Sequence, residues 1–166
     1  MTGTLWSGSI GAGDELRAEP GGLQGRVRSV EVHDQRVERA EAGQRVAVGL
    51  VGVERSALRR GQALVERDVF PVGFRLDVRL EGDDFAPTST VHIGTAAIPA
   101  RIVRDGNYGQ LRLSEAVVAA RGDRIVLRTR TTIGGGVVLD PGPPRGLDLE
   151  RLALLDGGDA KAIVRH

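Results

Sequence analysis

The sequence contains no cysteine, so disulfides and thiolate metal sites are excluded and nothing points to an oxidising compartment. Aromatic residues make up only 3% of the 166 residues, whereas hydrophobic residues reach 40%. The core must therefore be built from Val, Leu, Ile and Ala. No apolar run approaches the ~20 residues of a membrane span, and the first residues lack the basic and apolar regions of a signal peptide. We expect a cytoplasmic protein without a membrane partner.

Lysine is nearly absent as well. Lys161 is the only lysine among 23 basic residues, and the net charge is +1 because acids are about as numerous as bases. Arginine is the better residue for bidentate phosphate contacts. Abundant Ala and Gly, however, favour a compositional bias as the source of the arginine excess.

Most of the chain reads as short strands separated by turns. A phase slip in the alternation between Val27 and Val30 predicts a β-bulge. Alternating or Val-rich runs predict strands at 2–8, 26–33, 45–53, 63–67, 74–80, 90–105, 108–115, 123–129 and 136–144.

One turn pattern recurs four times: glycine, then Asp or Gln, then an outgoing strand. Glycine supplies a backbone conformation that is costly for other residues, and the Asp or Gln side chain can hydrogen-bond the turn backbone. Such turns between short strands favour barrels or sandwiches. The four glycines are Gly13, Gly43, Gly61 and Gly122.

The alternation breaks near residues 67–73, at the sequence FPVG, and this break predicts two units. We expect an all-β fold of two consecutive small antiparallel β-barrels, over 1–69 and 70–144, followed by a short helical segment over 145–166. Apolar spacing predicts a helix at 147–155 that ends at the glycines 157–158, and a second helix over 159–166.

Three consecutive glycines, 134–136, raise the question of a phosphate-binding loop. Such a loop needs a helix N-terminus behind it and a Gly-Lys-Ser/Thr ending, but a strand and prolines follow here. The glycines are therefore predicted to turn the chain sharply into a buried last strand. His33, His92 and His166 lack metal-ligand spacing, and no nucleophile motif is present, so no enzyme is predicted.

Two sets of arginines recur at strand spacing, so each set would share one strand face. Such rows can contact a nucleic-acid backbone. They can equally be solvated faces paired with local acids such as Glu31 and Asp123. The candidate contacts are Arg26, Arg28, Arg124, Arg128 and Arg130.

The order of motifs is similar to a known class. TGTLWSG, GDELR, RVRSVEVH and AEAGQRVAVGL resemble the second domain of the elongation-factor-Tu class of translational GTPases, and ARGDRIVLRT and TIGGGVVLDP resemble the end of its third domain. The details fit best with the bacterial selenocysteine-specific elongation factors (SelB). The resemblance runs from Thr2 to about Pro144, and residues 147–166 resemble the start of that family's C-terminal helical extension.

The resemblance implies two β-barrels that hold an aminoacyl-tRNA together with a GTPase domain. Its partners would be selenocysteinyl-tRNA and, through the full-length parent, the ribosome, with no DNA partner. The arginine of the AGQR motif, Arg45, would line the selenocysteine pocket, where a positive charge suits an ionised selenol. The residues alone leave a second interpretation open, in which Arg45 is an ordinary strand-start arginine in a turn that also carries Glu41.

The chain also departs from that family. It has no P-loop and no guanine-specificity motif, so GTP and Mg, the family's cofactors, are not expected to bind this chain. The first barrel is expected to lack its opening strand, which leaves Leu5 and Trp6 beside a gap with only one of them facing inward. The chain is thus expected to be a fragment without enzymatic activity. The alternative function is a structural or protein-interaction β-barrel pair of another translational GTPase.

Overall fold

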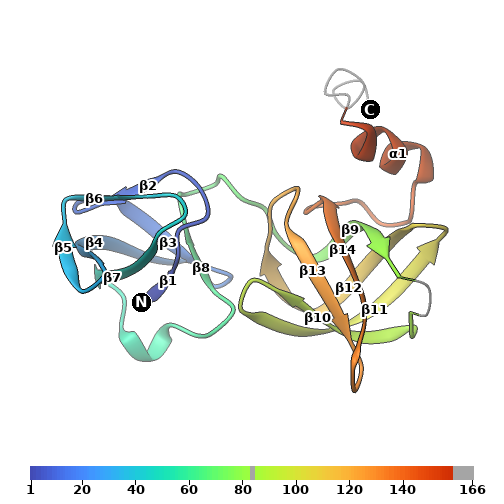
Figure 1. The fold of residues 1–166 in the computed structure, drawn as a ribbon, viewed down its shortest axis with the longest axis horizontal. Coiled ribbons are helices and arrows are strands. Elements are labelled where there is room, and N and C mark those ends of the chain that lie inside the picture. The colour runs from blue at the N-terminus through green and yellow to red at the C-terminus, as the bar shows by residue number, and fades with distance from the viewer. Residues whose placement is uncertain (83–84, 159–166) are drawn as a thin grey trace. The chain divides into compact units, whose positions relative to one another are not determined.

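The computed structural model describes residues 1–82 and 85–158 and divides into two compact units, Met1–Val69 and Phe70–His166 (Figure 1). Both consist of antiparallel strands, and the second also carries the helix α1 (Leu149–Gly157). The structure thus has the expected all-β class with a short helix after the strands. The second helix expected over 159–166 lies outside the described residues.

The first unit contains a six-stranded sheet in the order β1-β7-β4-β3-β8, with β5 paired to β4 and a separate β2–β6 pair. Among the described residues this ladder ends at β1 and β8 and does not close. Val-rich strands supply its core, in which Val30 and Ala40 are fully buried. The strands are β1 (Thr2–Thr4), β2 (Ser9–Gly11), β3 (Glu15–Glu19), β4 (Leu23–Val32), β5 (Gln35–Val37), β6 (Arg39–Glu41), β7 (Arg45–Val51) and β8 (Ala63–Val65), with a 3-10 turn at Arg55–Ala57.

Two local expectations for the first unit are confirmed. The register between β4 and β7 shifts between Val27 and Ser29, where the phase slip predicted a bulge. Of the adjacent pair after β1, Leu5 packs against the core and Trp6 is 84% exposed. One side chain of the pair therefore faces inward and the other faces solvent.

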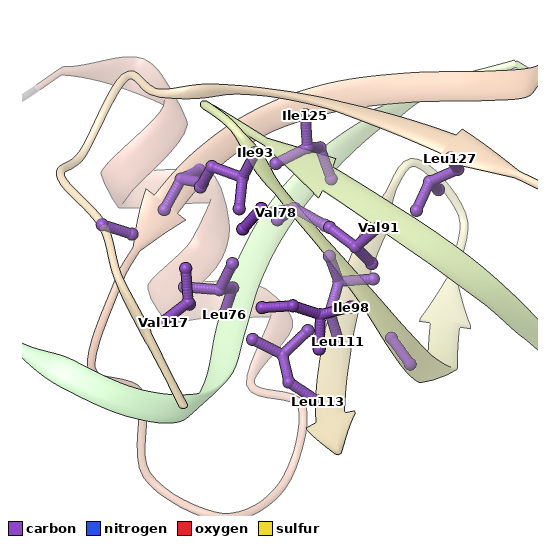
Figure 2. Packing of buried hydrophobic residues seen from close by; sticks show 14 of the residues in the cluster. Leu76, Val78, Val91, Ile93, Ile98, Leu111, Leu113, Val117, Ile125 and Leu127 are labelled. Atoms are coloured by element: carbon purple, nitrogen blue, oxygen red, sulfur yellow. The ribbon is translucent and has the colours of Figure 1, made fainter. Parts of the chain in front are cut away.

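The second unit is a closed six-stranded barrel in the order β10-β11-β12-β9-β14-β13. Leu76, Val91, Leu111 and Leu127 belong to the cluster of side chains in its interior (Figure 2). All four have no exposed surface. Aliphatic side chains fill this core, as the low aromatic content required. The strands are β9 (Val72–Glu81), β10 (Thr88–Ile93), β11 (Ala96–Asp105), β12 (Tyr108–Val118), β13 (Arg124–Arg128) and β14 (Thr132–Asp140).

Residues 90–105 do not form the single strand that their alternation predicts. They form the hairpin β10–β11, which pairs Ile93 with Ala96 across a turn at Gly94 and Thr95. Gly94 has φ +53, a left-handed conformation that favours glycine. The inward positions are odd-numbered in β10 (Val91, Ile93) and even-numbered in β11 (Ala96, Ile98), so the alternation slips by one residue at the turn.

The three glycines at 134–136 are also placed differently from the prediction. They do not form a turn but lie inside β14, paired with β13 on one side and β9 on the other. A Cβ on Gly136 would lie 2.3 Å from the Arg79 carbonyl oxygen, and one on Gly135 would lie 2.7 Å from the Ile125 carbonyl oxygen. Glycine is therefore required at these two positions because the backbones of the neighbouring strands leave no room for a side chain.

The recurrent glycine turn forms as predicted at all four positions. Each glycine has φ between +90 and +97. The following Asp or Gln accepts a hydrogen bond from the backbone N–H three residues before it. The four bonds are Gly11 to Asp14 (2.8 Å), Glu41 to Gln44 (2.8 Å), Arg59 to Gln62 (2.7 Å) and Ala120 to Asp123 (2.8 Å).

The helix α1 packs on the outside of the closed barrel. Asp148 caps its N-terminus by accepting a hydrogen bond from the Arg151 N–H (3.0 Å), and Gly158 ends it with φ +73. Leu152 and Leu155 are buried against Leu139 of β14. Successive strand residues point to opposite faces, so Val138 faces the core while Leu139 contacts the helix. The register shift between Val138 and Asp140 places Asp140 opposite Asp77.

Candidate nucleic-acid interface

Three arginines stand side by side across adjacent strands of the closed barrel. Arg75 of β9 lies opposite Arg112 of β12, and Arg112 lies opposite Arg101 of β11. Their sequence neighbours Leu76, Leu111 and Ile102 belong to the core, so the arginines face outward. We call Arg75, Arg101 and Arg112 the arginine row.

Two members of the arginine row, Arg101 and Arg112, line a shallow, open depression of ≈ 540 Å³. Thr88 of β10 lies opposite Arg101, and Thr90 lies opposite Arg128 of β13. Arginine and hydroxyl side chains therefore share one surface. The depression is lined by Thr88, Ser89, Thr90, Pro99, Ala100, Arg101, Arg112, Leu113, Ser114, Arg128 and Thr129, none of which is acidic.

The charges of the arginine row are not balanced by the described part of the chain. No ion pair is recorded for Arg75, Arg101, Arg112 or Arg128 within residues 1–82 and 85–158. Like charges directly opposite one another in a sheet destabilise it. The arrangement therefore costs stability in the isolated barrel, and a bound anion would remove that cost.

Guanidinium groups and hydroxyls are the donors that phosphate oxygens prefer in proteins. Neighbouring strands lie about 4.8 Å apart, so the three arginines span roughly 10 Å, a length suited to a chain of phosphates rather than one. The described residues hold no group of three His, Cys, Asp or Glu residues that could bind a metal ion. The surface is equipped for binding a polyanion.

The structure brings only one of the five arginines proposed from sequence to this depression. Arg128 lines it, whereas Arg124 is exposed at the opposite end of β13 and Arg130 follows the strand in a turn. Arg26 and Arg28 are both exposed on β4 of the first unit.

Sequence reasoning missed all three members of the arginine row. Each lies between apolar residues in an alternating run, which indicates an outward-facing position. That signal exists for many residues of the chain. Whether the three arginines become neighbours depends on the pairing register of three strands, and the alternation pattern does not predict this register.

Arg45 occupies the first position of β7 in the first unit and is exposed. Thr4 lies opposite it, and the turn before it is closed by the Gln44 side chain, which binds the Glu41 N–H. No ion pair between Arg45 and Glu41 is recorded in the described chain. The guanidinium is therefore available to an anionic group.

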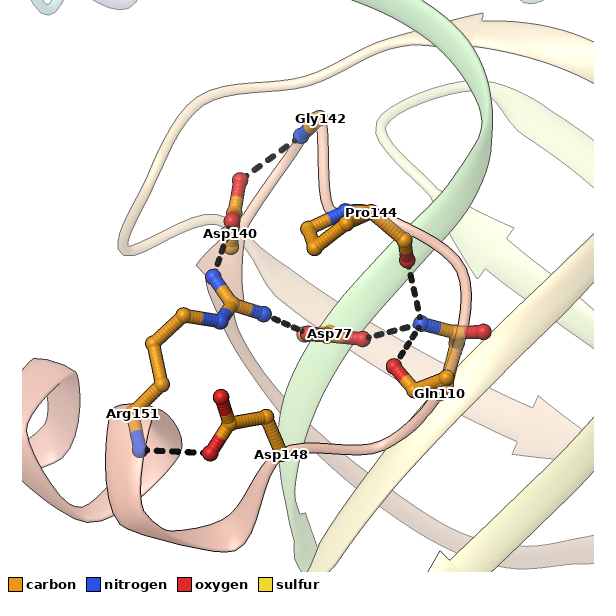
Figure 3. Close-up of polar contacts among 8 residues, drawn as sticks. Asp77, Gln110, Asp140, Gly142, Pro144, Asp148 and Arg151 are labelled. Atoms are coloured by element: carbon orange, nitrogen blue, oxygen red, sulfur yellow. Dashed lines mark hydrogen bonds and ion pairs between the residues drawn. The ribbon is translucent and has the colours of Figure 1, made fainter. Parts of the chain in front are cut away.

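A partly buried polar cluster adjoins the arginine row and holds α1 on the barrel (Figure 3). Arg151 of the helix binds the carboxylates of both Asp77 and Asp140, which lie opposite each other on β9 and β14. Gln110 of β12 donates to Asp77 at 2.9 Å. We call Asp77, Gln110, Asp140 and Arg151 the latch.

Burial raises the pKa of the Asp77 carboxyl, as does the nearby Asp140, although Gln110 and Arg151 act in the opposite direction. Asp77 has no exposed surface despite its outward position on β9. The alternation predicts an exposed carboxylate there, but the segment between β14 and α1 covers it. The ionised form of Asp77 thus depends on Arg151 and Gln110.

Further bonds attach the covering segment to the barrel. Gln110 also donates to the carbonyl oxygens of Pro144 (3.1 Å) and Gly146 (2.9 Å). Near the end of α1, Asp156 binds Arg79 (3.0 Å) and accepts a hydrogen bond from the Tyr108 hydroxyl (3.3 Å). Partial burial and the charge of Asp156 raise the pKa of Tyr108.

The described residues do not fit a bound nucleotide. The glycine run lies within β14, where backbone N–H groups are used in strand pairing and no helix follows to receive phosphates. In the described part of the chain no helix is long and apolar enough to cross a membrane.

Comparison with known proteins assigns both units. Residues 1–65 match the family "Elongation factor Tu domain 2", and residues 86–145 match "Selenocysteine-specific elongation factor, beta-barrel domain". The selenocysteine-specific elongation factor of Escherichia coli (strain K12) is 33% identical over 154 residues, which cover 87% of this chain and 25% of that protein. The one from Desulfomicrobium baculatum is 29% identical over 161 residues, covering 85% and 25%.

A solved structure agrees with these matches. The crystal structure of a bacterial selenocysteine-specific elongation factor superposes with a TM-score of 0.84 and 26% identity, over 95% of this chain and 28% of that one. The chain spans about a quarter of the length of the relatives named above. Its first unit is thus similar to an elongation factor Tu domain 2, and its second unit is similar to the beta-barrel domain of selenocysteine-specific elongation factors.

Proposed function

We propose that this chain holds selenocysteinyl-tRNA in a translation elongation factor. The closed barrel binds the phosphate backbone of the tRNA through the arginine row, and the first unit presents Arg45 to the aminoacyl end. Delivery to the ribosome and GTP hydrolysis belong to the full-length parent, in the cytoplasm where aminoacyl-tRNAs are used. The chain itself contributes binding and no catalytic step.

The observation that carries this proposal is the arginine row: three guanidinium groups on adjacent strands that have no ion pair within residues 1–82 and 85–158, two of which line a depression without acids. An RNA backbone supplies phosphates in a row, and neutralising several of them releases counterions. The relatives are named for selenocysteine, which supplies the amino acid in this proposal. A selenol is largely ionised near neutral pH and serine is not, so one arginine can distinguish them by charge.

Replacing Arg45 with Gln should reduce the preference of the chain for selenocysteinyl-tRNA over seryl-tRNA by about three- to tenfold. The reason is that only the selenolate gains from the guanidinium, while backbone contacts are common to both tRNAs. Affinities would be measured by fluorescence anisotropy. Arg36→Gln removes an equally exposed charge from β5 of the same unit and should leave the ratio unchanged. An unchanged ratio in Arg45→Gln would show that Arg45 does not read the amino acid.

A further inference from the structure

The arginine row and the latch occupy neighbouring rungs of the same two strands. On β9 the outward positions run Arg75, Asp77, Arg79, and their partners on β12 are Arg112, Gln110 and Tyr108. The first rung belongs to the arginine row, the second to the latch, and the third contacts Asp156 of α1. The proposed anion site and the surface on which α1 packs are thus adjacent.

The balance of charge at the second rung depends on the helix. Asp77 and Asp140 share one cation, Arg151, which comes from α1. The alternative cation on β9, Arg79, is bound by Glu81 (3.2 Å) and Asp156 (3.0 Å). When α1 leaves the barrel, Arg151 and Asp156 leave with it, so Asp77 and Asp140 lose the cation that binds both, and Arg79 keeps only Glu81 as a recorded partner.

We propose that docking of α1 through Arg151 and phosphate binding at the arginine row favour each other. This coupling rests on the proposed function, because it concerns the same RNA-binding surface. Asp77 and Arg75 are two residues apart on one strand face, about 7 Å, which is within the Debye length at physiological salt. An uncompensated Asp77 attracts Arg75 and repels an incoming phosphate, whereas Arg151 cancels that effect.

Coupling of this kind is reciprocal. RNA bound to the arginine row disfavours the state in which Asp77 and Asp140 are unpaired, so it holds α1 on the barrel. Whether α1 is docked on the barrel thereby depends on whether RNA is bound to the arginine row. No change in the barrel itself is required, since the signal is carried by one charged side chain.

The test uses the full 166-residue chain and a fluorescein-labelled RNA hairpin of about 12 base pairs, long enough to present an A-form backbone. The measurements are made at about pH 8, because burial raises the pKa of Asp77 and the proposed effect needs this carboxyl in its charged form. Arg151→Met should weaken RNA binding about fivefold, and adding Asp77→Asn should restore most of the loss. Asp77→Asn alone should bind at least as tightly as the native chain.

A matched control separates the local effect from net charge. Arg151→Met combined with Glu150→Gln restores the net charge on the exposed first turn of α1 but leaves Asp77 without its cation. Its affinity should stay as low as that of Arg151→Met. If it recovers as fully as the Asp77→Asn combination, the effect is one of net charge and the proposal is wrong.

Hydrogen exchange supplies the reciprocal measurement. In the native chain, saturating RNA should slow exchange of the amides of Leu152 and Leu155 about fivefold, and in the Asp77→Asn/Arg151→Met chain it should have no such effect. Equal exchange with and without RNA in the native chain overturns the coupling.

Arg101→Gln distinguishes the two proposals. If it leaves RNA affinity unchanged, the proposed function fails. If it weakens RNA binding while Arg151→Met does not, only the coupling fails.

Discussion

Replacing Arg75, Arg101 and Arg112 together with glutamine should lower the affinity of the chain for a tRNA minihelix by about a hundredfold at ~100 mM salt. Each guanidinium that meets a phosphate releases about one counterion, so the slope of log affinity against log salt should fall by about 2–3 units. The same variant should be at least as stable as the native chain, because like charges on adjacent strands are removed. Loss of binding with retained or increased stability identifies a binding surface rather than a structural one.

The control for this variant is a second triple substitution of exposed arginines, Arg36→Gln, Arg55→Gln and Arg145→Gln. None of the three has a recorded ion pair within the described residues. It removes the same net charge and should lower affinity less than about threefold. If both triple variants lose affinity equally, RNA binding is diffuse, and the chain reads better as a structural or protein-interaction pair of β-domains.

Gly136→Ala should destabilise the closed barrel by about 3 kcal/mol. The new Cβ would lie 2.3 Å from the Arg79 carbonyl oxygen and 3.3 Å from the Leu80 Cα. These are backbone atoms of the neighbouring strand, so no side-chain rotation relieves the clash and β9 must move away from β14. Urea unfolding followed by circular dichroism would measure the loss.

Gly73→Ala is the matched control for this substitution. Gly73 also lies in a strand of the same barrel, but its nearest neighbour, the Pro141 carbonyl oxygen, is 3.9 Å from the added Cβ. Its free energy of unfolding should change by less than about 0.5 kcal/mol. Equal stability of Gly136→Ala and the native chain would mean that close strand approach is not what requires glycine in β14.

Features with a local cause were predictable from the sequence. The four glycine turns are set by residues within three or four positions of one another, and all formed as expected. The helix α1 ends at the predicted glycines but begins at Leu149, two residues after its predicted start. The hairpin at Gly94 was missed because Gly-Thr lacks the Asn-Gly or Asp-Gly signal of a tight turn. The glycine run was misplaced because sequence does not show which strand will approach another closely.

The candidate site was only partly predictable, for the same reason. Arg128 stood out by its spacing from Arg124, but the arginine row depends on the register of three strands. Asp77 alternates with Leu76 and Val78, a pattern typical of a surface residue, and only the covering segment and α1 bury it. Its partner Arg151 lies 74 residues away in the sequence. Contacts of this range cannot be read from periodicity.

Nuclear magnetic resonance of the arginine side chains tests the central claim most directly. The chain would be labelled with ¹⁵N and titrated with the tRNA minihelix, and the guanidinium Nε–Hε signals followed. Those of Arg75, Arg101 and Arg112 should shift together and saturate at one RNA per chain, while that of Arg36 stays in place. Saturable binding that shifts Arg36 and the other exposed arginines but leaves the arginine row unchanged would contradict the proposal that this row holds the RNA backbone.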